Sequence, residues 1–223
     1  MDLAAVRGRI AAAAARAGRR ADVVTIVAVT KGHPVERVQE AAAAGLLDIG
    51  ESRVQEAAAK QAAWPGAPVR WHLIGHLQRN KAKESVGRFA LIHSLDSVRL
   101  ADALEAAAAG AGVVQEVLVE VNVAREPQKS GVLPEDAPGL VAHAAQRPHL
   151  RVGGLMAIAP YTLDTGVQRQ AFRQLRELRD GLATSVLPLA VLSMGMSDDF
   201  EAAVEEGATM VRLGTILFGE RAS

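Results

Sequence analysis

The chain of 223 residues has no cysteine, few aromatic residues and no excess of charge of either sign. The absence of cysteine excludes disulfide bonds, thiolate catalysis and cysteine-ligated metals. Aromatic residues make up only 3% of the chain, which argues against a base-stacking surface for nucleic acid. The 25 basic and 25 acidic residues cancel, so no overall field attracts nucleic acid or an anionic membrane. Any anion site must therefore be local.

The sequence also lacks a long uncharged apolar run. Residues 1–17 are rich in alanine, but they include Asp2, Arg7, Arg9 and Arg16, so they predict a surface helix rather than a signal peptide. No stretch approaches the roughly 18 uncharged apolar residues that a transmembrane helix needs. We therefore expect no membrane partner, and the lack of cysteine is compatible with a cytoplasmic protein.

Apolar, β-branched runs alternate with helical patterns along most of the chain. The predicted strands cover residues 23–31, 46–49, 69–74, 89–93, 116–123, 152–157, 189–192 and 210–213. The predicted helices cover residues 1–17, 35–44, 51–63, 80–86, 97–109, 134–145, 167–182 and 200–206. This order predicts an α/β fold, a (β/α)8 TIM barrel with an extra N-terminal helix, in one domain of residues 1–223. A doubly wound sheet is the alternative, but no G-x-G-x-x-G motif follows a strand.

Lys31 ends the first predicted strand, and Gly32, His33 and Pro34 follow it as a turn. Chemistry in a parallel barrel takes place at the C-terminal ends of the strands. A partly desolvated lysine amine at such a position can lose its proton and form a Schiff base with an aldehyde. The alternative is a lysine that only marks the exit of the strand into water, because lysine is usually exposed.

The last two predicted strands end in segments rich in glycine and hydroxyl groups. The loops after strands 7 and 8 of such barrels often bind phosphate through backbone N–H groups and helix N-termini. Glycine lets the backbone approach closely, and hydroxyl groups donate to phosphate oxygens. The segments contain Ser193, Gly195, Ser197, Gly214 and Thr215. The alternative for Ser197 is a helix N-cap, with Asp198 and Asp199 complementing the helix dipole.

One ligand suits a lysine, a phosphate site and an arginine at the same mouth. Pyridoxal phosphate (PLP) has an aldehyde for Lys31, and a phosphate for Ser197, Gly214 and Thr215. Arg212 could face the ring nitrogen. Because arginine keeps its proton, the ring nitrogen would stay unprotonated and PLP would be a weaker electron sink than with an aspartate partner. The alternative for Arg212 is a salt bridge at the barrel mouth.

The histidines form no H-E-x-x-H or H-x-H pattern, so the sequence predicts no metal site. We expect His72 to be a core histidine bonded to backbone or a residue of the mouth. The residues expected at the C-terminal strand ends are Lys31, Gly50, Glu51, His72, Gly75, His76, His93, Ser94, Asn122, Met156, Ser193 and Arg212.

The sequence resembles the pyridoxal phosphate homeostasis protein family, the single-domain relatives of the alanine racemase N-terminal barrel. The segments that carry the resemblance are VAVTKGHP (27–34), IGESRVQEAAAK (49–60), WHLIGHLQRNKAK (71–83), VLVEVNVAREPQKSG (117–131), GGLMAIAP (153–160), FRQLRELRD (172–180) and LSMGMSDDFEAAVEEGATMVRLGTILFGER (192–221). The resemblance implies a fold-type III barrel that holds PLP as a Schiff base on Lys31. It places the phosphate in the SMGMSDD and RLGT segments and Arg212 at the ring nitrogen.

The implied role is PLP storage, buffering or delivery, with PLP, related B6 vitamers and PLP-dependent apoenzymes as expected partners. Two segments depart from the family pattern. Relatives commonly read Gly-Glu-Asn-Tyr where residues 50–53 are Gly-Glu-Ser-Arg, and Leu-Gln-Ser-Asn-Lys where residues 77–81 carry Arg79 in the third place. These departures change the contacts expected around the ring and the charge expected at the mouth.

Racemisation needs one base on each face of the substrate. Related racemases use the barrel lysine and a tyrosine from a second domain. This chain ends just past its last predicted strand, and its one tyrosine, Tyr161, falls in a loop. We therefore expect a monomeric, cytoplasmic PLP-binding protein without efficient catalytic activity. The main alternative is a weak PLP-dependent amino-acid racemase or lyase, and a Schiff-base aldolase without PLP and a non-catalytic interaction protein are further alternatives.

Overall fold

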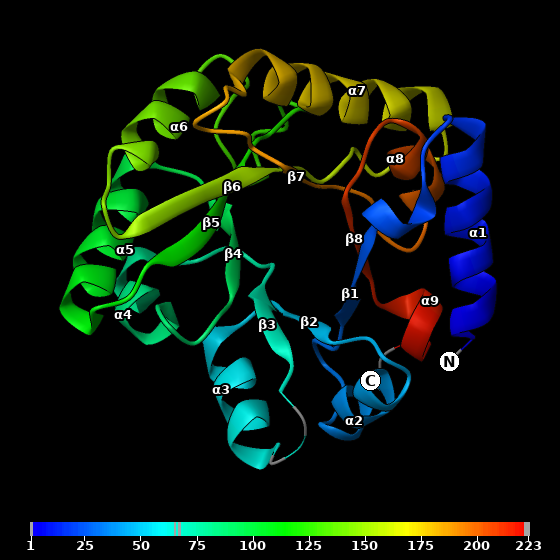
Figure 1. Ribbon diagram of the computed structural model, residues 1–223, viewed down its shortest axis with the longest axis horizontal. Coiled ribbons are helices and arrows are strands. Elements are labelled where there is room, and N and C mark those ends of the chain that lie inside the picture. The colour runs from blue at the N-terminus through cyan, green and yellow to red at the C-terminus, as the bar shows by residue number, and fades with distance from the viewer. Residues whose placement is uncertain (1, 65, 67, 221–223) are drawn as a thin grey trace.

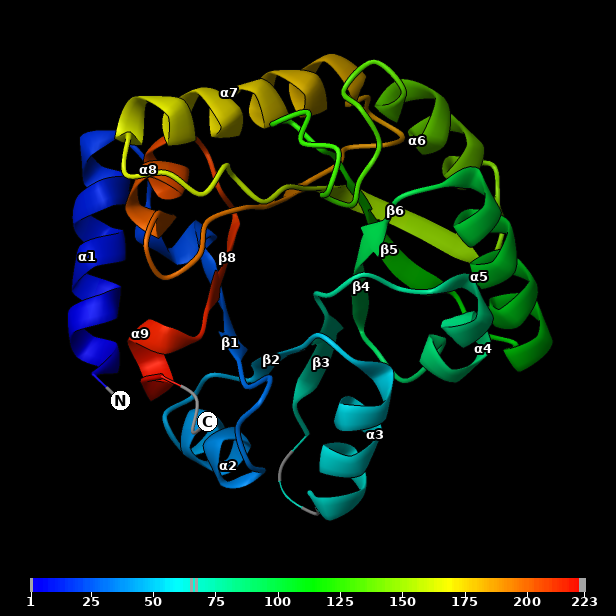
Figure 2. The same cartoon turned by 180° about the vertical axis from the view of Figure 1, so that it is seen from behind.

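Eight parallel strands close into a barrel in the computed structural model, which describes residues 2–64, 66 and 68–220 (Figures 1 and 2). The strands pair in chain order, and β8 returns to pair with β1. They are β1 (Thr25–Val29), β2 (Asp48–Glu51), β3 (Arg70–Leu73), β4 (Leu91–Leu95), β5 (Gln115–Glu120), β6 (Leu150–Met156), β7 (Val191–Ser193) and β8 (Met210–Leu213). The predicted (β/α)8 barrel is confirmed.

Helices connect the strands and form the outer layer of the barrel (Figure 1). They are α1 (Leu3–Arg16), α2 (Glu36–Ala43), α3 (Val54–Ala63), α4 (Ala82–Ser85), α5 (Val98–Ala111), α6 (Ala137–Ala145), α7 (Thr165–Leu182), α8 (Phe200–Glu205) and α9 (Thr215–Phe218), with 3-10 turns η1 (Ala21–Val23) and η2 (Arg79–Lys81). Side-chain caps fix several starts: Ser97 accepts a hydrogen bond from the Leu100 amide at α5, and Asp164 accepts two at α7.

The extra N-terminal helix α1 lies against α8, beside the last strands of the barrel (Figures 1 and 2). Val6 and Ile10 on its apolar side are buried, and this burial holds the helix against the rest of the protein. Arg9 pairs with Glu201 at 2.8 Å and stacks over the Phe200 ring at 4.7 Å. The ion pair is exposed and adds little, so the apolar contact fixes α1.

Inward- and outward-facing side chains alternate along each strand, so the apolar residues form two separate layers. The outer layer lies between strands and helices and includes Ile26 and Ala28. The inner cluster fills the barrel and consists of Val27, Leu91, Leu118, Met156 and Met210. Side chains two residues apart share a face of a strand, so His93, Glu120 and Arg212 point to the interior above Leu91, Leu118 and Met210. The strand period therefore brings polar groups together under the mouth.

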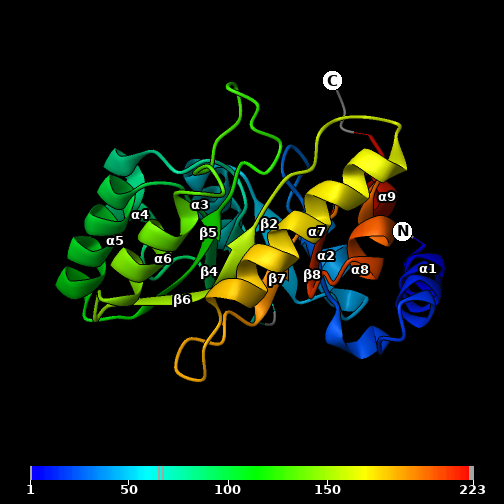
Figure 3. The ribbon, with the colours of Figure 1, turned by 90° about the horizontal axis from the view of Figure 1, so that it is seen from above.

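The C-terminal strand ends form the mouth, and Figure 3 shows the loop after β5 rising from this end. The segment between α7 and β7 extends from the opposite end. Within the described ranges, none of the helices is both long enough and apolar enough to cross a bilayer.

The element boundaries differ from the predicted ones at several positions. The last strand, residues 210–213, is as predicted. The first is shorter at both ends than the predicted 23–31, because residues 21–23 form η1 and β1 ends at Val29, so Lys31 lies in the turn after the strand. The helix expected over residues 51–63 begins at Val54, because Glu51 ends β2 and Arg53 occupies the N-cap. The helix predicted over residues 80–86 is split between η2 and α4, and the short helix α9 was not predicted.

Candidate functional site

A cavity of about 210 Å³ lies at the mouth, at the C-terminal ends of β1 and β8. It brings together most of the predicted cofactor residues, namely Lys31, Ser197, Arg212, Gly214 and Thr215. Its other lining residues are Val29, His33, Ile74, Ile158, Met196 and Asp198. Ser193 and Gly195 are buried and are not part of the lining. We call this space the Lys31 cavity.

The loop that carries Lys31 is held by a compact ionic cluster below it. Lys60 on α3 is only 7% exposed, and its Nζ donates to the Thr30 carbonyl at 2.6 Å, Glu51 Oε1 at 2.6 Å and Glu56 Oε1 at 2.9 Å. Thr30 Oγ1 also donates to Glu51, at 2.5 Å, and the Gly32 amide donates to Glu56, at 2.6 Å. Thr30 bonds to Lys60 and Glu51, and Gly32 bonds to Glu56, so both neighbours of Lys31 are tied to one cluster of charged side chains.

The two carboxylates of this cluster respond differently to burial. Burial raises the pKa of Glu51 above its ordinary value and outweighs the hydrogen bonds from Lys60 and Thr30. Burial also opposes ionisation of Glu56, but the bonds from Lys60 and the Gly32 amide bring its pKa below the usual value. Glu51 needs its bond to Lys60 because it is fully buried.

Ser197 joins the two glycine-rich segments. Its Oγ accepts hydrogen bonds from the amides of Gly214, at 3.4 Å, and Ile216, at 3.3 Å. The alternative reading of Ser197 as a helix N-cap is wrong, because α8 begins at Phe200 and Asp199 is its N-cap residue. Asp199 instead accepts the Met196 amide at 2.6 Å and tightens the loop. The Ser197 hydroxyl thus keeps its proton for a donor role toward the cavity.

Gly195 shapes the backbone under this loop. Its φ of +93° lies in the region that favours glycine, and a Cβ there would come within 2.6 Å of the Ala203 side chain. Its carbonyl accepts the Arg212 amide at 2.9 Å. Gly195 therefore joins the strand 7 loop to β8 from behind the cavity.

Arg212 is held by oxygen atoms of neutral groups. Its Nη1 donates to the Ser193 carbonyl and to Ser193 Oγ, both at 2.7 Å, and its Nη2 donates to the Ala157 carbonyl at 2.9 Å. The salt bridge that was the alternative for Arg212 is not among the ion pairs of the described residues. Burial lowers the pKa of Arg212 to about 10, against the fields of Asp199 and Glu120. The guanidinium therefore stays cationic at neutral pH.

His72 is buried in the core, as one of the two expectations had it, but its ring contacts side chains rather than backbone. Its ring contacts His93 Nε2 at 2.9 Å and Asp48 Oδ1 at 2.9 Å, inside the barrel. His93 also contacts Ser193 Oγ at 2.9 Å and is completely buried. Sequence reasoning missed this cluster, because its members come from four different strands.

A second cavity of about 210 Å³ adjoins the first and shares Lys31, Ile74 and Ile158 with it. Ser52, which stands where relatives have asparagine, lines this cavity together with Asn122 and Lys129. Its remaining lining residues are Gly75, His76, Glu120, Val121 and Ser130. We call this space the Glu120 cavity.

Glu120 was not predicted as a site residue. It is 6% exposed, and its Oε2 is buried without a hydrogen-bond partner in the described part of the chain. Burial and the nearby Asp96 raise the pKa of Glu120 to about 7, although Arg212 acts in the opposite direction. The mouth therefore holds a carboxyl group poised to exchange a proton near neutral pH. Its position two residues after Leu118 on an inward face was the available signal.

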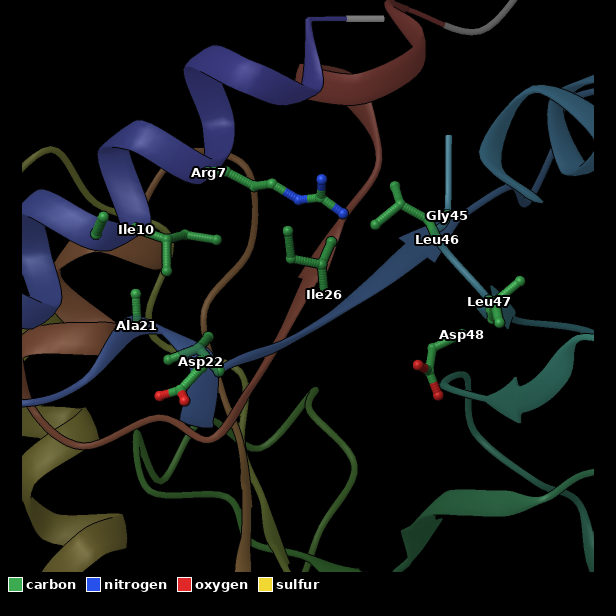
Figure 4. Close-up of a pocket in the computed structure, with 11 residues that line it drawn as sticks. Arg7, Ile10, Ala21, Asp22, Ile26, Gly45, Leu46, Leu47 and Asp48 are labelled. Carbon is green, nitrogen blue, oxygen red and sulfur yellow. The ribbon is translucent and has the colours of Figure 1, made fainter. Parts of the chain in front are cut away.

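A larger pocket, of about 460 Å³, opens at the opposite end of the barrel beneath α1 (Figure 4). Most of its lining is apolar, with Ile10, Ile26 and Leu46 around it, and it includes no lysine and no hydroxyl side chain. The chemistry therefore favours the smaller cavities at the mouth as the functional site. Among residues 2–64, 66 and 68–220, no group of three His, Asp or Glu side chains is arranged to hold a metal ion.

A parallel barrel with a lysine after β1 and a hydroxyl- and amide-lined cavity at β8 defines a class, the barrels of the alanine racemase N-terminal kind. The sequence matches the family described as "Alanine racemase, N-terminal domain" over residues 1–222. It is 46% identical to the pyridoxal phosphate homeostasis protein of Aquifex aeolicus, over 98% of this chain and 96% of that one. It is also 46% identical to the protein of that name from Pseudomonas aeruginosa, over 99% of this chain and 94% of that one. The chain belongs to the pyridoxal phosphate homeostasis protein family, so the predicted resemblance is confirmed.

Solved structures agree with this assignment. PipY of Synechococcus elongatus, described with PLP bound, is 38% identical with a TM-score of 0.82, over 96% of this chain and all (100%) of that one. A protein of unknown function from Bifidobacterium adolescentis is 35% identical with a TM-score of 0.89, over 96% of this chain and 91% of that one. Alanine racemase from Streptomyces coelicolor is 24% identical with a TM-score of 0.73, over 97% of this chain and 58% of that one, and shares the fold.

Proposed function

We propose that this chain binds pyridoxal 5'-phosphate and serves in PLP homeostasis by storing, buffering or delivering it, with residues 1–223 acting as one PLP-binding barrel domain. PLP would occupy the Lys31 cavity as a Schiff base on the Lys31 amine. Related B6 vitamers and PLP-dependent apoenzymes are the other expected partners. We place this role in the cytoplasm and expect a monomer.

The observation that carries the proposal is the convergence of three chemistries in the Lys31 cavity. Lys31 supplies an amine, Ser197 and Thr215 supply hydroxyl groups, and Arg212 supplies a buried cation. These groups match an aldehyde, a phosphate and a ring nitrogen in type and number. PLP binding by the 38% identical PipY protein supports the same choice.

Each residue has a role in holding the cofactor. The Lys60 cluster fixes the backbone around Lys31, so the amine approaches the cavity from a defined direction. Ser197 donates its hydroxyl proton toward the phosphate while two backbone amides anchor its oxygen. Arg212 presents N–H groups and cannot accept a proton, so it favours an unprotonated ring nitrogen. When bound, PLP supplies an electrophilic aldehyde carbon and an electron sink, which this arginine weakens.

We infer that the protein has no efficient catalytic activity. A racemase needs a second base opposite the lysine. Tyr161, the one tyrosine of the chain, is 99% exposed and lines neither cavity at the mouth. The relatives are named for homeostasis rather than for a reaction, which supports the same reading.

The test is an absorption titration of the purified chain with PLP. We expect a near-visible Schiff-base band that saturates at one PLP per chain. Lys31→Ala should remove the band, whereas Lys83→Ala, which changes an exposed lysine on α4, should keep it. A chain that gains no such band would refute the proposal.

One observation favours a weak amino-acid racemase or lyase as a second candidate. Glu120 lines the cavity next to Lys31 and has a pKa of about 7, which suits a general base. The loaded protein incubated with L-alanine would then release D-alanine or a cleavage product. Turnover near 1 per second or above, abolished in Glu120→Gln, would establish this function over the binding role.

A further inference from the structure

Arg212 is connected to the far end of the barrel by an unbroken row of side chains. Arg212 donates to Ser193 Oγ at 2.7 Å, and Ser193 Oγ lies 2.9 Å from His93 Nδ1. His93 Nε2 lies 2.9 Å from His72 Nδ1, and His72 Nε2 lies 2.9 Å from Asp48 Oδ1. All five residues are buried, with none above 7% exposure. We call this row the barrel relay.

The two ends of the barrel relay fix the direction of every hydrogen bond in it. Arg212 can only donate, so the Ser193 oxygen accepts from it, and the Ser193 proton is available for donation to His93 Nδ1. This agrees with the pKa of His93, which burial above all keeps well below the usual value. A neutral His93 with its proton on Nε2 then donates to His72 Nδ1.

The far end gives the same direction. Burial opposes ionisation of Asp48, but hydrogen bonds from His72 and Arg70 hold its pKa below the usual value, so Asp48 is a carboxylate that only accepts. His72 must therefore donate from Nε2, and the proton that His93 carries on Nε2 makes His72 Nδ1 the acceptor between the two rings. One tautomer of each histidine satisfies the whole row, and it is the same tautomer from either end.

We propose that Ser193, His93, His72 and Asp48 are positioning residues that lock the Arg212 guanidinium toward the Lys31 cavity. The inference rests on the proposed function for its effect on PLP, because Arg212 is the group expected to face the ring nitrogen. The relay itself is a property of the chain without any ligand. Its outer end is accessible, since Arg70 is 65% exposed in its side chain and Asp48 lines the pocket beneath α1 (Figure 4).

The relay explains why Arg212 is oriented without an ion pair at the mouth. Hydrogen bonds in a low-dielectric interior polarise one another, and a partly satisfied row is costly. Rotation of the Arg212 guanidinium would remove one hydrogen-bond partner of Ser193. It would also disturb the hydrogen bonds of His93 and His72, which end at Asp48. The row thus couples the orientation of Arg212 to a carboxylate at the other end of the barrel.

The first experiment reads the histidine tautomers by nitrogen-15 NMR in the chain without PLP. We expect His93 to be neutral and protonated on Nε2, and His72 to carry a proton on Nε2. The variant His72→Gln replaces the ring nitrogen that accepts from His93 with an amide on a flexible side chain, so the His93 ring nitrogen shifts should move. His149→Gln is the matched control, because His149 pairs with Glu105 at 2.8 Å outside the barrel interior.

The second experiment measures the PLP dissociation constant and the position of the absorption band. His72 touches neither cavity at the mouth, yet His72→Gln should weaken PLP binding about 3- to 10-fold, the effect of one lost hydrogen bond. It should also move the absorption maximum, which a loss of stability alone would not do. Ser193→Ala, which cuts the relay beside Arg212, should reproduce both changes if His72→Gln folds poorly.

The relay is wrong if His93 carries its proton on Nδ1 in the unloaded wild-type chain. It is also wrong if His72→Gln and Ser193→Ala bind PLP with the affinity and spectrum of the His149→Gln control. If the wild-type chain does not bind PLP, the proposed function is wrong, and so is the role of the barrel relay toward PLP. The NMR result would still show whether the barrel relay has the tautomers proposed here.

Discussion

Lys31 and Arg212 line the same cavity, but the protein supports them in two different ways. Lys31 follows a strand whose end is fixed by a compact cluster of Glu51, Glu56 and Lys60, close by in the chain. Arg212 is held by a row of side chains that reaches from β8 to Asp48 at the start of β2. The cluster fixes a backbone through full charges, whereas the relay fixes one guanidinium through mostly neutral groups. The first support should matter more for folding and the second more for the ligand.

The largest effect should follow from breaking the compact cluster with Lys60→Met. The change keeps much of the side-chain volume but leaves the fully buried Glu51 without its cation, and breaking a buried pair costs about 3–5 kcal/mol. Urea unfolding measures the change. Lys81→Met is the control, because Lys81 pairs with Glu84 on the surface, and there we expect a loss below about 1 kcal/mol. Equal losses in the two variants would show that the cluster does not stabilise the fold.

Glu120 lines the cavity next to Lys31, and its effect on stability should depend on pH. Its pKa is about 7 in the fold and near 4.5 when unfolded, so its proton stabilises the fold fully below pH 4.5, and this contribution is lost as pH rises through 7. Relative to wild type, Glu120→Gln should become more stable by up to about 3 kcal/mol between pH 5 and pH 8. Thermal or urea unfolding across this range measures the difference.

The matched control for Glu120 is Glu116→Gln, on the same strand but paired with Arg151 at the surface. That variant should follow the wild-type pH profile within about 0.5 kcal/mol. A Glu120→Gln profile parallel to wild type would mean that the carboxyl group titrates normally and finds a partner in solution.

A smaller effect should separate the two cavities at the mouth. Ser197→Ala removes a hydroxyl that we assign to the phosphate, and a hydrogen bond to a charged group is worth about 1.5–3 kcal/mol. We therefore expect PLP binding to weaken by at least about tenfold, with a change in unfolding free energy below about 1 kcal/mol. Ser130→Ala changes a hydroxyl of the Glu120 cavity and should have little effect on affinity. The reverse ranking would place the phosphate in the Glu120 cavity.

The difference between the two supports also explains how much of the fold and of the site the sequence could predict. Strand runs and turn signals predict the barrel and the convergence of Lys31, Ser197 and Arg212, because parallel strands bring their C-terminal ends together. Even the β8 boundaries, residues 210–213, follow from the β-branched and apolar run before Gly214. Local periodicity is enough wherever the chemistry depends on which end of a strand a residue occupies.

The sequence alone could not predict the Lys60 cluster or the barrel relay. Lys60 lies in an alanine-rich helix and looks like an ordinary surface lysine, because its burial depends on how α3 packs beside β2. His93 and Ser193 are 100 positions apart in the chain, and their contact depends on the register and tilt of the whole barrel. The alternative of an N-cap at Ser197 arose because helix starts are the least certain feature of a local pattern.

The most direct test of the central claim locates the covalent attachment of PLP. The loaded protein is reduced with borohydride, digested, and searched by mass spectrometry for the lysine that carries the pyridoxyl group. The proposed function predicts the label on Lys31 alone. A label on Lys129, the other lysine that lines the Glu120 cavity, with Lys31 unmodified, would contradict it.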